Sequence, residues 1–188
     1  MSGPIVVNFF GAPGAGKSTN AAALFASLKR SGVNCELVTE YAKDCVWRES
    51  ENILKDQMYV FAKQHNRLFR LRDKVDAIIT DSPLMMNLIY AGHCTPTFKA
   101  LIKETANSFD NLDVLIRRTK AYNPVGRMQT AAESDEIAER IERLLHDHVG
   151  FFVEETSDAD PATLTAVVRG ALTARKTNEM LKYQKIDE

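Results

Sequence analysis

Residues 8–19 read NFFGAPGAGKST, and this stretch sets the architecture that the rest of the chain must follow. Positions 11–18 match the spacing G-x-x-x-x-G-K-[ST], and they follow an apolar run, Ile5–Phe10, which is expected to be a buried strand. Glycines allow the backbone to bend so that successive N–H groups point inward and bind an anion. A helix expected over Lys17–Arg30 adds the positive end of its dipole. The stretch therefore predicts a phosphate-binding loop, called the P-loop below (residues 11–18).

In such a loop the lysine contacts the β- and γ-phosphates of a nucleotide, and the hydroxyl of the next residue binds Mg²⁺. Lys17 and Ser18 hold these positions. Asp81 follows an expected strand, Val75–Thr80, and a carboxylate at the carboxyl end of a central parallel strand lies where such sheets bind ligands. We expect Asp81 to hold the same metal, with a helix cap or turn as the alternative. The predicted ATP-binding residues are Gly11, Ala12, Pro13, Gly14, Ala15, Gly16, Lys17, Ser18 and Thr19; the alternative is a glycine-rich turn that binds nothing.

Short strand patterns alternate with longer helical patterns along the whole chain. This alternation predicts a three-layer α/β/α P-loop NTPase fold with a five-stranded parallel sheet. A length of 188 residues fits one domain, 1–188. The expected strands are Ile5–Phe10, Cys35–Thr39, Val75–Thr80, Leu112–Ile116 and Phe151–Glu154. The expected helices are Lys17–Arg30, Asn52–Lys74, Leu84–Tyr90, Phe98–Asn107, Asp135–Asp147 and Ala162–Ala174.

The composition, 45% hydrophobic and 26% charged residues, is that of a globular protein. Because 24 Lys and Arg balance 25 Asp and Glu, any contact with nucleic acid must use local basic patches. Three cysteines without C-x-x-C spacing argue against a disulfide framework or a zinc site and fit a reducing compartment. No signal-peptide pattern or membrane-length apolar run occurs. We therefore expect a cytoplasmic protein with no membrane partner.

The residues around the P-loop favour phosphoryl transfer over hydrolysis. Ser82 stands next to Asp81, where hydrolysing ATPases usually carry a second acid, and the GTPase patterns Asp-x-x-Gly and Asn-Lys-x-Asp do not occur at the required places. Transfer to an acceptor requires that water be kept out. The segment 117–132, RRTKAYNPVGRMQTAA, is predicted to be an arginine-rich lid, with Arg118 and Arg127 as the first choices to neutralise the γ-phosphate and Arg117 as the third. A solvated basic loop is the alternative.

Candidate acceptor residues lie after the second expected strand and on the next helix. Glu40 ends that strand and is predicted to orient an acceptor hydroxyl and take its proton, with a strand-end charge or helix cap as the alternative. Tyr41 and Trp47 are predicted to stack on a pyrimidine. Gln64 is a candidate for reading a base edge, and Arg67, with its basic neighbours, for lining a phosphodiester track. In the alternatives, Trp47 belongs to the core and the basic face is merely solvated.

Four stretches resemble a set of phage-encoded P-loop proteins. They are NFFGAPGAGKST (Asn8–Thr19), ELVTEYAKD (Glu36–Asp44), QMYVFAKQHNRLFRLRDKVDAIITDSPL (Gln57–Leu84) and YNPVGRMQ (Tyr122–Gln129). The chain is also similar, more distantly, to nucleoside kinases of the ribosylnicotinamide kinase type, in which an acidic residue after the second strand faces the acceptor. The resemblance covers about residues 5–130.

The phage set includes 5-hydroxymethyluracil DNA kinases, which phosphorylate the hydroxymethyl group of a modified pyrimidine in DNA during DNA hypermodification. The resemblance implies a nucleoside- or nucleotide-kinase-like fold, use of ATP and Mg²⁺, a DNA substrate carrying the modified base, and a place in the host cytoplasm. A flipped or single-stranded base would be needed in a closed pocket. Three alternatives stay open: a kinase of a free nucleoside or nucleotide, a DNA-stimulated ATPase, and a non-catalytic nucleotide-binding module.

Overall fold

The structure is a computed structural model that describes residues 3–125 and 129–184. A five-stranded sheet forms its centre, with the strand order β2-β3-β1-β4-β5 and every neighbouring pair parallel. The predicted α/β fold with a five-stranded parallel sheet is confirmed. The strands are β1 (Ile5–Phe10), β2 (Cys35–Val38), β3 (Ala77–Thr80), β4 (Asp110–Arg117) and β5 (Val153–Thr156).

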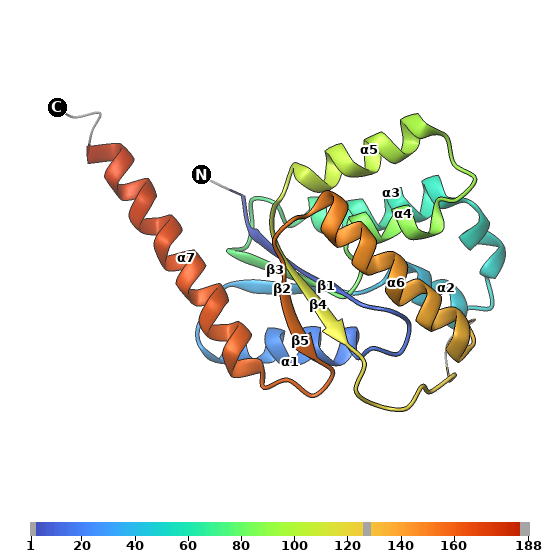
Figure 1. Ribbon diagram of the computed structural model, residues 1–188. Coiled ribbons are helices and arrows are strands. Elements are labelled where there is room, and N and C mark those ends of the chain that lie inside the picture. Colours follow the sequence, from blue (N-terminus) through green and yellow to red (C-terminus); the bar gives the residue numbers. More distant parts are fainter. Residues whose placement is uncertain (1–2, 126–128, 185–188) are drawn as a thin grey trace.

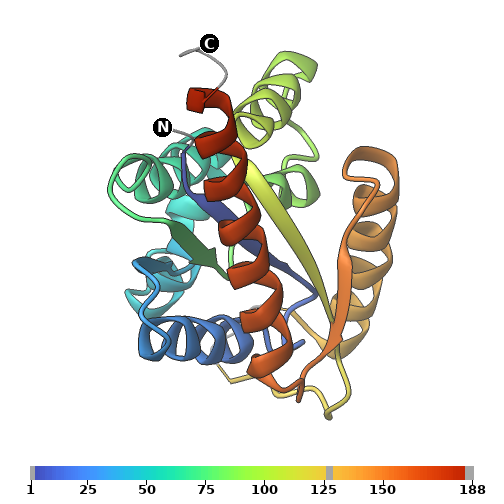
Figure 2. The ribbon, with the colours of Figure 1, turned by 90° about the vertical axis from the view of Figure 1, so that its left-hand side faces the viewer.

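Helices cover both faces of this sheet (Figures 1 and 2). One face carries α1 (Lys17–Arg30) and α7 (Pro161–Gln184), whose apolar side chains pack with one set of strand residues. The other face carries α3 (Gln57–Phe69), α4 (Asn87–Tyr90), α5 (Pro96–Asn107) and α6 (Ala131–His148). Because both faces are covered, all six residues of β1 are buried. This explains why the strand reads as a continuous apolar run.

The parallel register places the ends of three strands at one edge of the sheet. Asn8 of β1 and Val38 of β2 both lie beside Thr80 of β3. The chain therefore leaves β1, β2 and β3 at neighbouring points, where it continues into the P-loop, Glu40 and Asp81. This edge is the one at which open parallel sheets bind ligands.

Two elements differ from the sequence prediction. The single helix expected over Asn52–Lys74 is wrong: the chain forms a 3₁₀ turn, η1 (Glu51–Lys55), and then the shorter α3. The division falls at Asp56, whose side chain accepts a hydrogen bond from the Tyr59 N–H at 3.1 Å and so caps a new helix. The sequence analysis also missed α2 (Tyr41–Trp47), a seven-residue helix in which Cys45 is the buried residue.

The remaining boundaries shift by a few residues. Helix α6 begins at Ala131 because Thr130 and Glu133 form a reciprocal capping box there. Helix α7 continues to Gln184, ten residues past its expected end, and its far part extends beyond the sheet (Figure 1). A second short 3₁₀ turn, η2 (Leu84–Met86), precedes α4. In the described part of the chain, none of the helices combines the length and hydropathy that crossing a bilayer requires.

Candidate nucleotide-binding site

The P-loop bends through backbone conformations that suit glycine. Gly11, Gly14 and Gly16 have φ values of 150°, 83° and 94°. A Cβ atom on Gly11 would lie only 2.9 Å from the carbonyl oxygen of Ile116. Helix α1 starts directly after Gly16, which forms no side-chain cap, and no acid occupies the first turn. The first N–H groups of this helix are therefore not occupied by a capping side chain and suit an anion.

Lys17 lies folded over the loop. Its Nζ donates to the carbonyl oxygen of Gly11 at 2.7 Å and to that of Ala12 at 3.3 Å. These contacts hold the ammonium group against the first two residues of the P-loop. An ammonium group in this position supplies a positive charge for a phosphate chain.

Ser18 and Asp81 join the first turn of α1 to the end of β3. The Ser18 hydroxyl donates to Asp81 Oδ2 at 2.5 Å, and Asp81 is 3% exposed. Its other oxygen, Oδ1, is buried without a hydrogen-bond partner among the described residues. A buried carboxylate oxygen without a partner is costly, so this pair fits a cation well.

The donor set fits a magnesium ion. Mg²⁺ is usually held by one or two protein oxygens, with phosphate oxygens and water completing its coordination. Ser18 and Asp81 supply such oxygens beside the P-loop. Elsewhere in residues 3–125 and 129–184 no group of three or more His, Cys, Asp or Glu side chains is placed to hold a metal ion.

Glu40 stands at the junction between β2 and α2, facing the same edge of the sheet. It is the residue before α2, but its side chain forms no capping hydrogen bond, so the structure does not support the helix-cap alternative. Burial raises the pKa of the Glu40 carboxyl, Lys17 lowers this pKa, and Asp81 raises it further. Glu40 therefore lies near enough to Lys17 and Asp81 to interact with both of them electrostatically.

Helix α3 holds the Glu40 segment in place through two side chains. Gln64, which is 2% exposed, accepts a hydrogen bond from the Tyr41 N–H at 3.0 Å and donates to the Thr39 carbonyl oxygen at 3.4 Å. The prediction that Gln64 reads a base edge is therefore wrong, because its amide is buried and used by the backbone. Arg67 pairs with Asp44 and donates to the Thr39 carbonyl oxygen at 2.9 Å.

The predicted base-stacking residues lie in different surroundings. Trp47 is 63% exposed at the end of α2, so it does not belong to the core. The Tyr41 ring already has two neighbours: the Tyr59 ring at 6.0 Å and the Arg67 guanidinium at 5.3 Å. The guanidinium of Arg67 thus contacts Asp44, the Thr39 carbonyl oxygen and the Tyr41 ring, while its contact with a phosphodiester track stays a prediction.

Two residues near Glu40 or its neighbours, Tyr90 and Arg140, were not predicted from the sequence. Although part of its ring is exposed, burial of the Tyr90 hydroxyl raises its pKa to about 12, and Glu40 raises this pKa while Arg140 lowers it. Arg140, from α6, donates to the carbonyl oxygen of Ile89 beside Tyr90. Packing of α4 against α6 therefore places the Arg140 guanidinium beside the Tyr90 phenol, which itself interacts with Glu40. Neither residue belongs to a motif, so the sequence carried no signal for them.

The arginines of the predicted lid fall in three places. Arg118 pairs with Asp135 and donates to the Ser134 hydroxyl at 3.2 Å, and Ser134 in turn donates to the Pro13 carbonyl oxygen of the P-loop at 2.8 Å. Arg118 is therefore linked to the P-loop through one side chain. Arg117 instead pairs with Glu142 and Glu154. Arg127 and the centre of the segment, 126–128, lie outside the described residues.

Comparison with protein families supports this description of the site. The family model described as "AAA domain" matches residues 6–158, which include the P-loop and all of the sheet except Ile5. The chain belongs to this AAA domain family. Such P-loop domains bind nucleotides, in general ATP together with Mg²⁺. No curated protein matches the chain. The family match supports the P-loop class and leaves the acceptor, and the phage DNA kinase type, as predictions.

Replacing Gly11 with alanine tests the P-loop geometry. The added methyl group would meet the Ile116 carbonyl oxygen at 2.9 Å in a backbone conformation that favours glycine, so the loop must shift. We expect ATP affinity to fall by about tenfold or more. Gly92→Ala is the matched control, because a Cβ there meets nothing within 4 Å. Calorimetric ATP titration of both variants is the measurement; equal affinities for ATP would contradict this geometry.

Proposed function

We propose that the chain is an ATP-dependent phosphotransferase whose acceptor is a hydroxyl group. The observation that carries this proposal is the position of Glu40. Its carboxyl interacts electrostatically with Lys17 and Asp81 and is not used as a helix cap. A carboxyl with a raised pKa beside the phosphate-binding residues suits a general base that accepts a proton from an acceptor hydroxyl.

In the proposed reaction the acceptor oxygen attacks the γ-phosphorus of ATP. The bond between this phosphorus and the β–γ bridging oxygen breaks, ADP leaves with the electron pair, and the acceptor proton passes to the Glu40 carboxylate. Lys17 balances negative charge on the phosphates. Magnesium held by Ser18 and Asp81 would neutralise charge on the phosphate oxygens. Tyr90 interacts with Glu40 and is a candidate for holding the acceptor, and Arg140 lies beside Tyr90.

Hydrolysis is the second activity that the AAA domain family allows. Activation of water for hydrolysis usually needs a second acid beside the strand-end aspartate. Here the neighbour of Asp81 is Ser82, whose N–H donates to the Thr80 hydroxyl at 3.1 Å. Because Asp81 has no second acid beside it, this arrangement favours transfer of the phosphoryl group to an acceptor held near Glu40 over attack by water.

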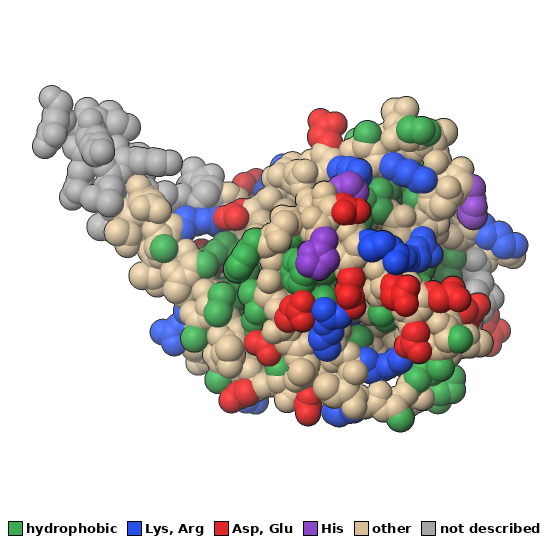
Figure 3. All heavy atoms as spheres, viewed as in Figure 1, with side chains coloured by type: hydrophobic (Ala, Val, Ile, Leu, Met, Phe, Trp, Pro, Cys, Tyr) green, Lys and Arg blue, Asp and Glu red, His purple; other side chains and the backbone are tan. Residues whose placement is uncertain are grey.

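For the acceptor we propose the 5-hydroxymethyl group of 5-hydroxymethyluracil in DNA. The resemblance at residues 36–44 and 57–84 supports this choice, since both stretches build the Glu40 side of the site. Exposed basic side chains lie on and after α3, at Lys63, Arg70 and Lys74. Acidic side chains gather over α6 instead (Figure 3). A polyanion would therefore approach along α3, near the exposed Trp47.

The acceptor is tested by incubating γ-labelled ATP with four candidates. They are single-stranded DNA containing 5-hydroxymethyluracil, the same DNA as a duplex, DNA with thymine instead, and free 5-hydroxymethyldeoxyuridine. We expect label on the modified DNA and none on thymine DNA, because only the former offers the hydroxyl. Transfer to the free nucleoside alone would move the proposal to a nucleoside kinase, and phosphate release without an acceptor would establish an ATPase.

Replacing Glu40 with glutamine tests the proposed base. We expect kcat to fall by about 10²–10⁴-fold with little change in ATP affinity. Because burial raises the pKa of Glu40, activity should rise with pH through a range above the ordinary glutamate value of about 4.3 as the carboxyl loses its proton. The variant should lose this rise. Glu36→Gln is the control, since Glu36 pairs with Lys29 on the surface. An unchanged kcat or pH profile in Glu40→Gln would remove Glu40 from this role.

A further inference from the structure

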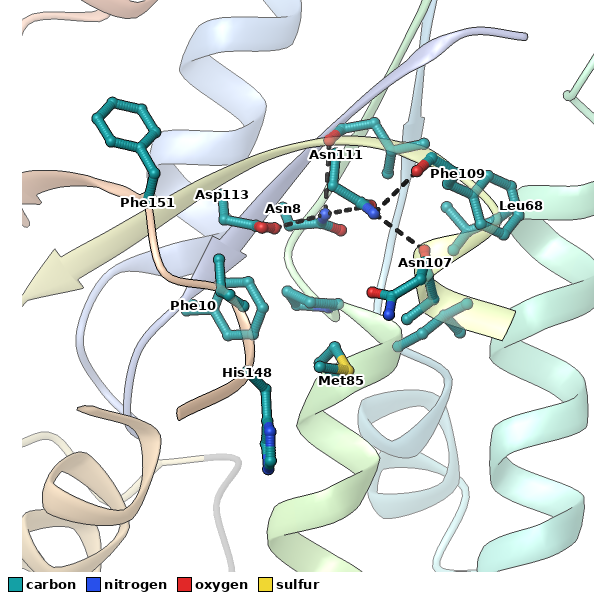
Figure 4. A pocket seen from close by; sticks show the side chains of 15 residues that line it. Asn8, Phe10, Leu68, Met85, Asn107, Phe109, Asn111, Asp113, His148 and Phe151 are labelled. Carbon is teal, nitrogen blue, oxygen red and sulfur yellow. Dashed lines mark hydrogen bonds between the residues drawn. The ribbon is translucent and has the colours of Figure 1, made fainter. Parts of the chain in front are cut away.

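A cavity lies on the α3–α6 side of the sheet, between β1, β4, η2 and the C-terminal ends of α5 and α6 (Figure 4). Its volume is about 310 Å³. Most of the lining residues are apolar. Polar side chains come from Asn8 of β1, from Asn111 and Asp113 of β4, and from Asn107 and His148 at the ends of α5 and α6. Asn8 and Asp113 are register partners in the sheet. Gly11 follows Asn8 by three residues, about 10 Å along an extended strand, so this polar cluster is separate from the nucleotide site.

A fixed hydrogen-bond chain sets the orientation of these polar groups. Asn111 donates to the carbonyl oxygens of Ala106 and Phe109, at 2.9 and 3.0 Å, so its own Oδ1 is an acceptor. Asn8 Nδ2 donates to Asn111 Oδ1 at 2.9 Å and to Asp113 Oδ1 at 2.8 Å. Asn8 is 5% exposed, so its side-chain amide is held in this orientation by buried hydrogen bonds. These hydrogen bonds use Asn111 Oδ1 and Asp113 Oδ1 as acceptors. Asn8 Oδ1 and Asp113 Oδ2 take no part in them.

No described residue donates a hydrogen bond to either of these two oxygens. Of the described residues that line the cavity, Asp113 and His148 are the titratable ones, and none is a lysine or arginine. Burial raises the pKa of Asp113 to about 6, so at neutral pH most molecules carry a carboxylate here without a positive partner. Burying such a charge is costly unless hydrogen-bond donors or a cation reach it.

The walls beside these acceptors are flat and aromatic. Phe10 and Phe109 line the cavity deep inside, and both are buried. Phe151 lies in the connection between α6 and β5 and is 79% exposed, which places an apolar ring at the rim (Figure 4). A volume of about 310 Å³ is at the small end of the range for ligand pockets, about 300–1,000 Å³, and suits a single planar ring system.

We infer that this cavity binds a planar heterocycle that presents two adjacent N–H donors, as an amino-substituted nucleobase does. One donor would reach Asp113 Oδ2 and the other Asn8 Oδ1, while the ring lies against the phenylalanine side chains. Guanosine has such a pair of donors, N1–H and the 2-amino group, and inosine lacks the amino group. These two nucleosides therefore form a matched pair of probes.

The test is calorimetric titration of the full chain with guanosine and with inosine, without ATP or acceptor. We expect guanosine to bind at least about tenfold more tightly than inosine, because loss of one donor leaves a buried acceptor without a partner. Asp113→Asn keeps the acceptor for Asn8 but replaces a carboxylate by an amide, so it should weaken guanosine binding by about tenfold or more. Asp110→Asn, at the exposed start of the same strand, is the control and should bind normally.

Lys17→Ala separates this site from the P-loop. Guanosine binding should be unchanged in that variant, and this result is independent of whether the chain transfers phosphate. Equal binding of guanosine and inosine, no effect of Asp113→Asn, or no binding of guanosine at millimolar concentration would each overturn the proposal. Loss of binding in Lys17→Ala with normal binding in Asp113→Asn would place guanosine in the P-loop and overturn it as well.

Discussion

The contact between Ser18 and Asp81 is the constraint on which the rest of the site depends. It joins the first turn of α1 to the end of β3 through a hydrogen bond of 2.5 Å, and it buries a carboxylate with one oxygen lacking a described partner. The pairing is possible because β1 and β3 are adjacent and parallel, with Asn8 beside Thr80. The contact between Ser18 and Asp81 therefore depends on the strand order and on the P-loop that leads into α1, and it supplies the oxygens proposed to bind the metal.

The charges around this contact explain why the site suits a metal-bound triphosphate. The Glu40 carboxyl interacts electrostatically with the ammonium group of Lys17, which favours its charged form, and with the carboxyl group of Asp81, which opposes it. A triphosphate adds further negative charge, which the lysine and the N-terminus of α1 can balance only in part. A divalent cation beside Asp81 would supply the missing positive charge. On this basis the two acids have different environments: Asp81 is bonded to Ser18, while Glu40 has a raised pKa and is not used as a cap.

The sequence was sufficient for the fold because its strongest signals are local. Ile5–Phe10 and Lys17–Arg30 have the predicted boundaries, since a buried central strand is apolar throughout and a glycine-rich bend must precede the helix. The break at Asp56 was missed because an apolar spacing continues across it, and a single capping hydrogen bond ends the pattern. Helix α2 was missed because a seven-residue helix with one buried residue shows no periodicity.

For the site, the sequence predicted the residues that follow strands and missed those that packing brings in. Lys17, Ser18, Asp81 and Glu40 lie together because parallel strands end at one edge. Gln64 was misassigned, since its buried amide bonds the backbone of residues 39 and 41, a contact between elements far apart in the chain. Tyr90 interacts with Glu40 and with Arg140 only because helices far apart in the chain pack together. Contacts between elements that are far apart in the chain produce no regular spacing of residues in the sequence.

The central claim is that Asp81 and Ser18 hold a magnesium ion against a triphosphate on the P-loop. The most direct measurement is the ATP dissociation constant with and without Mg²⁺, compared between the natural chain and Asp81→Asn. Asparagine can still accept the Ser18 hydrogen bond, so the fold should be kept. We predict that Mg²⁺ tightens ATP binding by about tenfold or more in the natural chain and has little effect in the variant. A magnesium effect of the same size in both would contradict the account.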